Sequence, residues 1–525
     1  MLLAAVASAG WKAYLLSRDA FPFNADEAVV GLMARHILSG ARPLFFYGQA
    51  YLGSLDAYLV AGAFRLFGES VLAIRMVQVA LYAGTVATSV ALAQKLIRPG
   101  WPAVFAGLLM AFPTVLITLY STVSLGGYGE ALLLGNLLLL LAVRAWGRVP
   151  EVRVGFLAGL LGGLGLWVFP LTLVVTLPVA FAIGVAWHRA GASTRRRTAI
   201  AAVGLGAALG AFLWWGPALR GGLIQQIREL LGSAIAGATP ITPADAFVSH
   251  LSNLVLFGPS VIFGFRPPWS VQPLIPILIP VVLAFWSAVV YHALAPRRDR
   301  GLPDWGRRLL LGVAAAVILG FLLTPFGADP SGRYFLPLAV PLALLAADLL
   351  DRIHRAGRRW LAPSILAGVL GFQILGTLSA AGMQPPGITT QFDVSTQLDH
   401  TWDEALISFL RDHDETRGYS TYWVSYPIAF VSHEVVILVP ALPYHADLRY
   451  TDRDHRYPPY GEEVGRSRRV AYVAAGNEAL ETFLRSGFQR QGIAWHEERI
   501  GDYLVFYGLS RSITPAELGL LDASP

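Results

Sequence analysis

The residues best placed to do chemistry are an adjacent acid pair, Asp26 and Glu27, which follows the first apolar segment of the chain. Val30, Met33 and Ile37 recur at helical spacing after it, so the carboxylate of Asp26 should lie on the apolar face of a helix. Placing a carboxylate this way near a membrane costs free energy, which indicates that the position has a structural or chemical role. In its ionised state it could act as a general base or as a cation ligand.

The same pair also fits a structural pattern. Asn24 and Glu27 have the spacing of a capping box, both acids fall in the first helical turn, and Gly40 suits the position just after the last turn. The two interpretations are compatible, because a carboxylate stabilised by the helix dipole stays ionised. Capping and chemistry therefore stand as equal alternatives at this point.

A second acid, Glu130, closes the turn SLGGYGE at residues 124–130, which also contains Tyr128. Three glycines in this turn allow backbone or ligand to approach closely. The structural alternative is an acid that only stabilises the N-terminus of the helix that follows.

A cationic group, Arg333, opens a later apolar segment together with Tyr334. Its planar guanidinium fits a phosphate, although an arginine that snorkels to the membrane interface would have the same sequence pattern. The stretch FFYGQAY at residues 45–51 adds Tyr47, Gln49 and Tyr51, which could line a substrate site or only anchor the chain among lipid headgroups.

Other catalytic patterns are missing from the sequence. There is no cysteine, no Walker loop, no dinucleotide fingerprint and no G-x-S-x-G motif, which argues against soluble nucleotide chemistry and thiol catalysis. His36 shares no metal-ligand spacing with another histidine, so we expect it to be a surface residue. The identity of any metal stays unknown.

The composition places these residues in a membrane protein. Of 525 residues 55% are hydrophobic and 14% are charged, which is too little polar surface for a soluble globule of this size. The net charge of +6 comes almost wholly from arginines in short clusters between apolar segments. Because these clusters form no continuous stripe, we expect no nucleic-acid partner.

The apolar segments predict about eleven transmembrane helices. We expect the first at residues 1–17, with Trp11, Lys12 and Tyr14 as interface anchors, and the others at 70–94, 102–120, 130–146, 154–170, 171–187, 198–216, 271–294, 308–324, 334–350 and 361–381. With this assignment the main arginine clusters fall in successive loops on one side, which the positive-inside rule makes the cytoplasm.

The other, exoplasmic side then receives the loops at residues 18–69 and 217–270, the SLGGYGE turn and the connection before Arg333. Helical apolar spacing at 223–235 and 244–257 predicts helices in the long loop, which either lie along the interface or over a cavity or are core helices without a role. We predict one module at 1–384 and a second, exoplasmic domain at 385–525.

The segment at 385–525 is polar enough to fold in water. Its patterns predict helices at 402–414 and 478–486, strands at 435–439 and 469–474, and a hairpin at 493–507 around Gly501, which together indicate a small α/β domain. Tyr419, Tyr422, Trp423 and Tyr426 could stack on sugar rings, but such a stripe more often belongs to a core.

Several of these features together resemble a known group. The acid pair with its continuation DEAVVGLMARHILSG, the GGYGE turn, the SGRYFLPLAVPLALL segment and the C-terminal domain are similar to the GT-C superfamily of membrane glycosyltransferases. The similarity is greatest to the bacterial branch of protein O-mannosyltransferase-like enzymes and lipid A aminoarabinose transferases.

The resemblance implies a polytopic helical enzyme of the bacterial inner membrane. It implies inverting transfer of a sugar from a polyprenyl-phosphate donor to a hydroxyl of a glycan, lipid or protein on the exoplasmic face. In the family the first acid of the pair is the catalytic base, which matches Asp26, while Glu27 and Glu130 would shape the acceptor site or bind a divalent cation. Many relatives have Asp where this chain has Glu130.

The chemistry is consistent with that implication, because a lipid phosphate leaves without needing a proton. One base and one cationic group would suffice, so Asp26 would take the hydroxyl proton and Arg333 would stabilise the departing phosphate. Two alternatives remain: a transporter or flippase, although the sequence has no repeated halves with midplane charges, and a catalytically silent relative.

Overall fold

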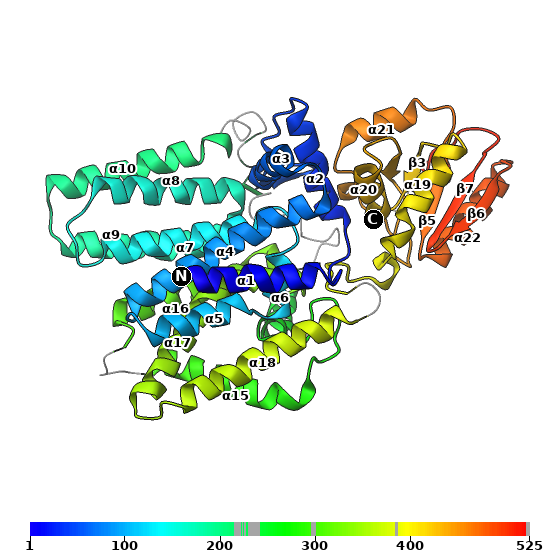
Figure 1. Cartoon of the computed structure of the whole chain (residues 1–525). Coiled ribbons are helices and arrows are strands. Elements are labelled where there is room, and N and C mark those ends of the chain that lie inside the picture. Colours follow the sequence, from blue (N-terminus) through cyan, green and yellow to red (C-terminus); the bar gives the residue numbers. More distant parts are fainter. Residues whose placement is uncertain are drawn as a thin grey trace. The chain divides into compact units, whose positions relative to one another are not determined.

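A computed structural model of the chain describes residues 1–214, 222, 224, 227–228, 242–295, 301–383 and 387–520. The chain forms two compact units (Figure 1). The first comprises Met1–Asp19, Ala50–Asp56 and Arg75–Gly382, and the second comprises Ala20–Gln49, Ala57–Ile74 and Met383–Pro525. The expected helical segment at 223–235 lies mostly outside the described residues, and the division at 384 stays a prediction.

The first unit is built from apolar helices. They are α1 (Leu2–Leu16), α4 (Val71–Leu96), α5 (Trp101–Ala111), α6 (Val115–Tyr120), α7 (Tyr128–Ala145), α8 (Val152–Val168), α9 (Leu173–Arg189), α10 (Thr194–Gly210), α13 (Pro243–Ser252), α14 (Gly258–Ile262), α15 (Ile279–Leu294), α16 (Asp304–Leu323), α17 (Ala339–Arg355) and α18 (Leu361–Ala381). Short 3-10 turns precede α9, α15 and α17, at Pro170–Thr172, Pro276–Leu278 and Arg333–Leu338. The helical pattern expected at 244–257 is confirmed as α13 continued by a π-helical turn at Asn253–Phe257, while its place along the interface stays a prediction.

Within the described part of the chain, seven helices are long and apolar enough to cross a membrane. Three shorter apolar helices, α1, α5 and α8, add to these, against the expected total of about eleven. The long spans are Val71–Leu96, Tyr128–Ala145, Pro170–Arg189, Pro276–Leu294, Asp304–Leu323, Arg333–Arg355 and Leu361–Ala381. A polytopic helical membrane protein is therefore confirmed.

Two sequence expectations for this unit are wrong. The single span at 102–120 is two helices, α5 and α6, because Pro113 lacks an amide hydrogen and forces the preceding Phe112 out of helical geometry. Lys12 is not an interface anchor. It is buried, its ammonium donates to Ser121 Oγ at 2.7 Å and Thr122 Oγ1 at 2.8 Å, and it faces the ring of Tyr82 at 4.5 Å.

Glycines let α8 and α10 pack with their backbones in contact. A Cβ added at Gly159 would lie 2.0 Å from the Val203 carbonyl oxygen, and one at Gly206 would lie 2.1 Å from that of Phe156. Helices in lipid associate through such small residues because no hydrophobic force drives them together there. These two helices run side by side along the first unit (Figure 1).

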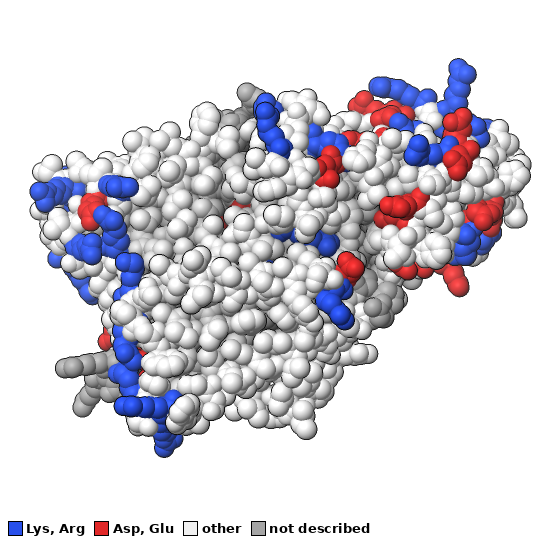
Figure 2. Space-filling model, viewed as in Figure 1, with Lys and Arg blue, Asp and Glu red and all other residues white. Residues whose placement is uncertain are grey.

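Basic side chains gather at one end of the first unit, where α9 meets α10 and α17 meets α18 (Figure 2). The sequence assignment predicted this clustering, since it placed the main arginine clusters in successive loops on one side. The clustering gives the bundle one strongly cationic end.

The second unit contains a five-stranded sheet. Its strands are β3 (Arg417–Ser420), β4 (Ile437–Pro440), β5 (Ala471–Ala475), β6 (His496–Ile500) and β7 (Tyr503–Tyr507), in the order β4-β3-β5-β7-β6. β3 pairs in parallel with β4 and β5, and β7 pairs antiparallel with β5 and β6. A buried core that includes Leu406, Ile428, Leu438 and Val505 stabilises this part.

The helices of this unit are α2 (Ala25–Leu38), α3 (Leu55–Phe67), α19 (Asp403–Asp412), α20 (Tyr422–Val431), α21 (Pro458–Gly465) and α22 (Glu478–Arg490). The predicted strands, the helices at 402–414 and 478–486, and the hairpin around Gly501 are confirmed within a few residues. The two-stranded ribbon of β1 (Phe45–Phe46) and β2 (Gln49–Gly53) and helix α3 were not predicted.

Candidate active site

Helix α2 positions Asp26 and Glu27 in its first turn. The Asn24 side chain accepts a hydrogen bond from the Glu27 amide at 3.0 Å, and Gly40 follows the last turn with a φ of 108°, so the predicted capping pattern is confirmed. Gly31 allows α20 to pack closely on α2, since a Cβ there would lie 2.5 Å from the Phe430 ring. The acids are thus fixed at the start of a helix that is packed against α20.

The two acids differ in exposure. Glu27 is fully buried, whereas Asp26 is partly exposed. The hydroxyl of Tyr422, at the start of α20, donates to Asp26 Oδ1 at 2.5 Å. A charge-assisted bond of this kind holds the carboxylate in one orientation. Of the pair, Asp26 is the one that a substrate could reach.

Further polar side chains surround the Asp26–Tyr422 pair. The guanidinium of Arg456 lies over the Tyr422 ring at 5.5 Å, and with its amide oxygen facing that guanidinium Gln49 accepts from it at 2.7 and 2.8 Å. Burial, opposed by Arg456 and reinforced by Asp26, raises the pKa of Asp454 to about 7. A carboxyl that titrates near neutrality therefore lies within electrostatic range of Asp26.

A polar network holds α2 to the segment that follows α20. Arg35 pairs with Glu69 and with Glu434, and His36 bonds to Glu434 at 2.9 Å and to the Tyr47 hydroxyl at 3.0 Å. Burial acts to raise the pKa of Glu434, but these hydrogen bonds and one from Tyr460 outweigh it and lower the pKa to about 2. The expectation that His36 is a surface residue is wrong, because α21 and the β1–β2 turn cover it.

In the first unit, Glu130 is buried in the first turn of α7 beside a second carboxyl, that of Asp56. Asp56 accepts from Gln78 at 2.9 Å and from Ser124 at 2.6 Å. Repulsion between two carboxylates buried this close together is relieved only when they share a proton or when a cation lies between them. Gly126 and Gly127 have φ values of 77° and 85°, so the turn before Glu130 needs glycine at both positions.

Arg333, also in the first unit, lies near the tyrosines Tyr128 and Tyr334. It pairs with Asp329 at 2.5 Å, faces the ring of Tyr334 at 5.1 Å and interacts electrostatically with Tyr128. Tyr51 is also close enough to interact with Tyr128 and Tyr334. The interpretation of Arg333 as a lone snorkelling arginine is therefore wrong, because an acid and aromatic rings hold it.

An apolar groove of about 420 Å³ begins at Tyr334 and runs between α9 and α16. It is lined by Phe169, Phe321 and Phe326 at the tyrosine end and by Leu177 further along. A groove with this lining fits a long hydrocarbon chain. Tyr334, which lines this groove, packs against the guanidinium of Arg333, a group that suits a chain that ends in a phosphate.

The predicted site residues thus fall into two groups. Asp26, Glu27, Tyr47 and Gln49 belong to the second unit, whereas Tyr51, Tyr128, Glu130, Arg333 and Tyr334 belong to the first. That both groups form one site stays a prediction. In the described part of the chain, no group of three or more His, Asp or Glu side chains could hold a metal, so the cation question stays open.

The sequence did not single out Asp56, Tyr422, Asp454 or Arg456. Asp56 had a usable signal, since it lies in the same loop, predicted to be exoplasmic, as Asp26 and begins an apolar helix. Tyr422 belonged to the aromatic stripe at 419–426, which was interpreted mainly as core, and Tyr422 and Tyr426 are indeed buried. Nothing local indicated that one of them would bond to Asp26.

Comparison with known proteins identifies the fold. No family model and no curated protein matches the sequence. Among solved structures, the chain is similar to ArnT from Cupriavidus metallidurans bound to undecaprenyl phosphate, with a TM-score of 0.55, 14% identity and 96% of both chains covered. The chain has the GT-C fold.

A second structure supports this fold. The oligosaccharyltransferase of Archaeoglobus fulgidus, in complex with Zn and sulfate, matches with a TM-score of 0.50 and 15% identity over 90% of this chain and 68% of that one. Because these two similarities cover 96% and 90% of this chain, the predicted fold class is confirmed. Similarity at this level of identity identifies the fold, whereas the reaction depends on the residues of the site.

Proposed function

We propose that this protein is a glycosyltransferase that moves a sugar from a polyprenyl-phosphate carrier to an acceptor hydroxyl on the exoplasmic face of the membrane. The observation that carries the proposal is the similarity over 96% of both chains to ArnT, a structure bound to undecaprenyl phosphate. The groove that leads from α9 and α16 to Tyr334 and Arg333 supports a lipid-linked donor. A lipid-linked donor also explains why the catalyst is built into a membrane.

Asp26 is the proposed general base. It would take the proton of the acceptor hydroxyl as the hydroxyl oxygen attacks the anomeric carbon and the bond from that carbon to the phosphate oxygen breaks. The polyprenyl phosphate leaves as an anion and needs no proton, so one base suffices and the configuration inverts. Tyr422 fixes the orientation of the base, and Glu27, which is buried, supports the helix start.

Arg333 is the proposed phosphate ligand of the carrier. Its ion pair with Asp329 and its position over Tyr334 hold the guanidinium in place before a donor arrives. A fixed cation next to the departing phosphate stabilises charge that grows in the transition state. Tyr128 and Tyr51 would border the same donor site, and Tyr47, Gln49 and Glu130 would shape the acceptor side.

The test uses proteoliposomes that contain the full chain and radiolabelled undecaprenyl-phosphate sugars, with release of the label as the measurement. We expect Asp26→Asn to reduce transfer by roughly 100- to 10,000-fold, the usual contribution of a general base. Asn keeps the shape of the side chain and can still accept from Tyr422, so folding should survive. We expect Arg333→Ala to raise the donor KM more than the acceptor KM.

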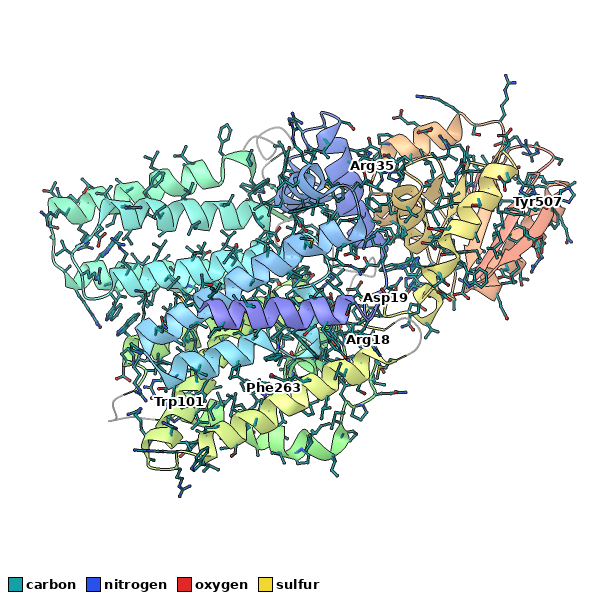
Figure 3. All side chains as sticks on the ribbon, in the orientation of Figure 1. Arg18, Asp19, Arg35, Trp101, Phe263 and Tyr507 are labelled. Carbon is teal, nitrogen blue, oxygen red and sulfur yellow. The ribbon has the colours of Figure 1, made fainter. Side chains whose placement is uncertain are left out.

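Matched controls lie together after α1, where Arg18 and Asp19 are exposed (Figure 3). Arg18→Ala and Asp19→Asn make the same chemical changes at neighbouring surface positions and should leave transfer unchanged. Normal turnover in Asp26→Asn would overturn the assignment of the base. Absence of label release from every undecaprenyl-phosphate sugar would favour a transporter or a silent relative instead.

A further inference from the structure

A second cavity, of about 850 Å³, lies between α9 and α16 at the cationic end of the first unit. Apolar side chains, including Phe181 and Leu309, form its inner wall. Its mouth carries two arginines, Arg189 and Arg308, and two indoles, those of Trp146 and Trp305. Neither the proposed base nor the proposed phosphate ligand belongs to this cavity.

The mouth is organised by ring contacts. Trp146 and Trp305 stack with their ring centroids 4.7 Å apart and an interplanar angle of 13°, and the guanidinium of Arg189 lies over Trp146 at 5.3 Å. Tryptophan and arginine together mark the headgroup level of a membrane, where the apolar body of each side chain is buried and the polar part stays wet.

Among the described residues that line the mouth, positive charge exceeds negative charge, with Arg189 and Arg308 against Asp304. Among the described residues, no carboxylate forms an ion pair with Arg189 or Arg308. Asp304 also lines the cavity, but it is 64% exposed and pairs with Arg307 at 3.0 Å. Two guanidinium groups therefore face a cavity with no counter-ion from the described protein.

The inner wall continues into a hydrocarbon path. Leu177 and Ala316 line both this cavity and the apolar groove described above, so the two adjoin along α9 and α16, and we call them together the channel. Phe181 and Leu323 are 75% and 71% exposed, which is unfavourable in water and suits contact with acyl chains. The channel thus has a cationic mouth at one end and a tail-sized apolar path behind it.

We propose that this cavity binds an anionic phospholipid, with its phosphate headgroup between Arg189 and Arg308 and an acyl chain between α9 and α16. Basic pockets between transmembrane helices take such headgroups, and uncompensated charge selects them over zwitterionic lipids. The carrier lipid is a less suitable occupant, because its phosphate belongs at the Arg333 end of the channel if it is to react.

The experiment titrates the purified full chain with phosphatidylglycerol or phosphatidylcholine of identical acyl chains and counts bound lipid by native mass spectrometry. We expect phosphatidylglycerol to bind roughly 30-fold more tightly, at about 1 kcal/mol for each arginine. R189Q/R308Q should abolish this preference, and R189K/R308K should keep most of it. R358Q/R359Q removes two exposed arginines from the turn before α18 and should change nothing.

A second variant separates the lipid from a free anion. A side chain added at Gly312 projects toward the cavity with only Pro178 nearby, so Gly312→Leu should fill the acyl path and weaken phosphatidylglycerol binding without changing charge. Equal binding in R189Q/R308Q would overturn the proposal. So would displacement of phosphatidylglycerol by inorganic phosphate, which would indicate an anion site, or by undecaprenyl phosphate, which would indicate the carrier. None of these results depends on glycosyl transfer.

Discussion

The hydrogen bond from Tyr422 to Asp26 joins residues 396 positions apart and has a measurable consequence. In Tyr422→Phe the carboxylate loses the donor that orients it, while the ring and its packing remain. A hydrogen bond to a charged group contributes ~1.5–3 kcal/mol, so we expect kcat to fall on the order of 10- to 100-fold with little change in donor KM. Steady-state transfer in proteoliposomes measures both constants.

Tyr419→Phe is the control for this prediction, because Tyr419 is a buried tyrosine of the same domain that packs on Tyr472. The control should keep full activity. If Tyr422→Phe also kept its kcat, the hydroxyl would have no part in positioning Asp26, and the bond would be only structural.

Local pattern was enough to find the acids and their caps. Asn24, Glu27 and Gly40 followed known helix-end rules, and the Asp26 carboxylate was placed at the start of α2 from spacing alone. Tyr422 and Arg456 could not be found this way, because their contacts with α2 and with the β1–β2 ribbon depend on chain folding over hundreds of residues. A side-chain contact between residues so far apart produces no local pattern in a single sequence.

Asp454 gives a second prediction at this scale, for stability against pH. Its pKa is about 7 in the fold and 3.8 ordinarily, so between these values the folded state binds a proton that the unfolded state has released. Stability from this group therefore falls as pH rises from about 4 to 7, by up to ~1.4 kcal/mol per pH unit, and levels off above pH 7.

The variant Asp454→Asn removes this titration. We expect the melting temperature of the variant minus that of the wild type to increase as pH rises from about 4 to 7. Tryptophan fluorescence in detergent measures both melting temperatures. The difference between the two proteins is the correct readout, because half-buried His455 has a lowered pKa and contributes the opposite slope in both. Glu434, whose pKa is lowered from 4.5 to about 2, changes stability mainly below pH 4.5 and does so equally in both proteins. Parallel curves for the two proteins would mean that Asp454 is ionised throughout.

At the scale of elements, the packing of α8 on α10 depends on glycine. Gly159→Ala would place a Cβ 2.0 Å from the backbone oxygen of Val203, which cannot move without shifting α10. We expect a loss of roughly 1–3 kcal/mol and a lower melting temperature. Gly204→Ala is the matched control on α10, since nothing lies within 4 Å of its added Cβ, and it should be neutral or slightly stabilising. An unchanged melting temperature for Gly159→Ala would contradict close backbone packing.

Helices and strands could be predicted from the sequence where a single local hydrophobic pattern determines them. The seven long apolar spans and the C-terminal hairpin were correctly predicted within a few residues, because hydrophobicity and a glycine turn act locally. The break at Pro113 was not predicted, because residues 102–120 are continuously hydrophobic and this pattern alone predicts one uninterrupted helix. Lys12 was misplaced for a related reason, since its hydroxyl partners Ser121 and Thr122 come from a distant turn.

At the scale of the whole molecule, the proposed reaction requires a particular orientation. The arginine-rich loops should face the cytoplasm, and the sheet of the second unit should face the exoplasm, where the carrier presents its sugar. Retention of lysine and arginine on the cytoplasmic side is a general property of multi-pass proteins. The gathering of basic side chains at one end of the first unit is the observation that supports this orientation (Figure 2).

Single cysteines can test this orientation directly, because the natural chain has none. Ala192, in the turn between α9 and α10, and Gln489, on α22, are both exposed. In intact spheroplasts, a membrane-impermeant maleimide should label Gln489→Cys and not Ala192→Cys, and in inverted vesicles the pattern should reverse. The cysteine-free parent gives the background, and detergent should expose both sites. Labelling of Ala192→Cys from outside would place the cationic end in the exoplasm and separate the proposed site from its donor.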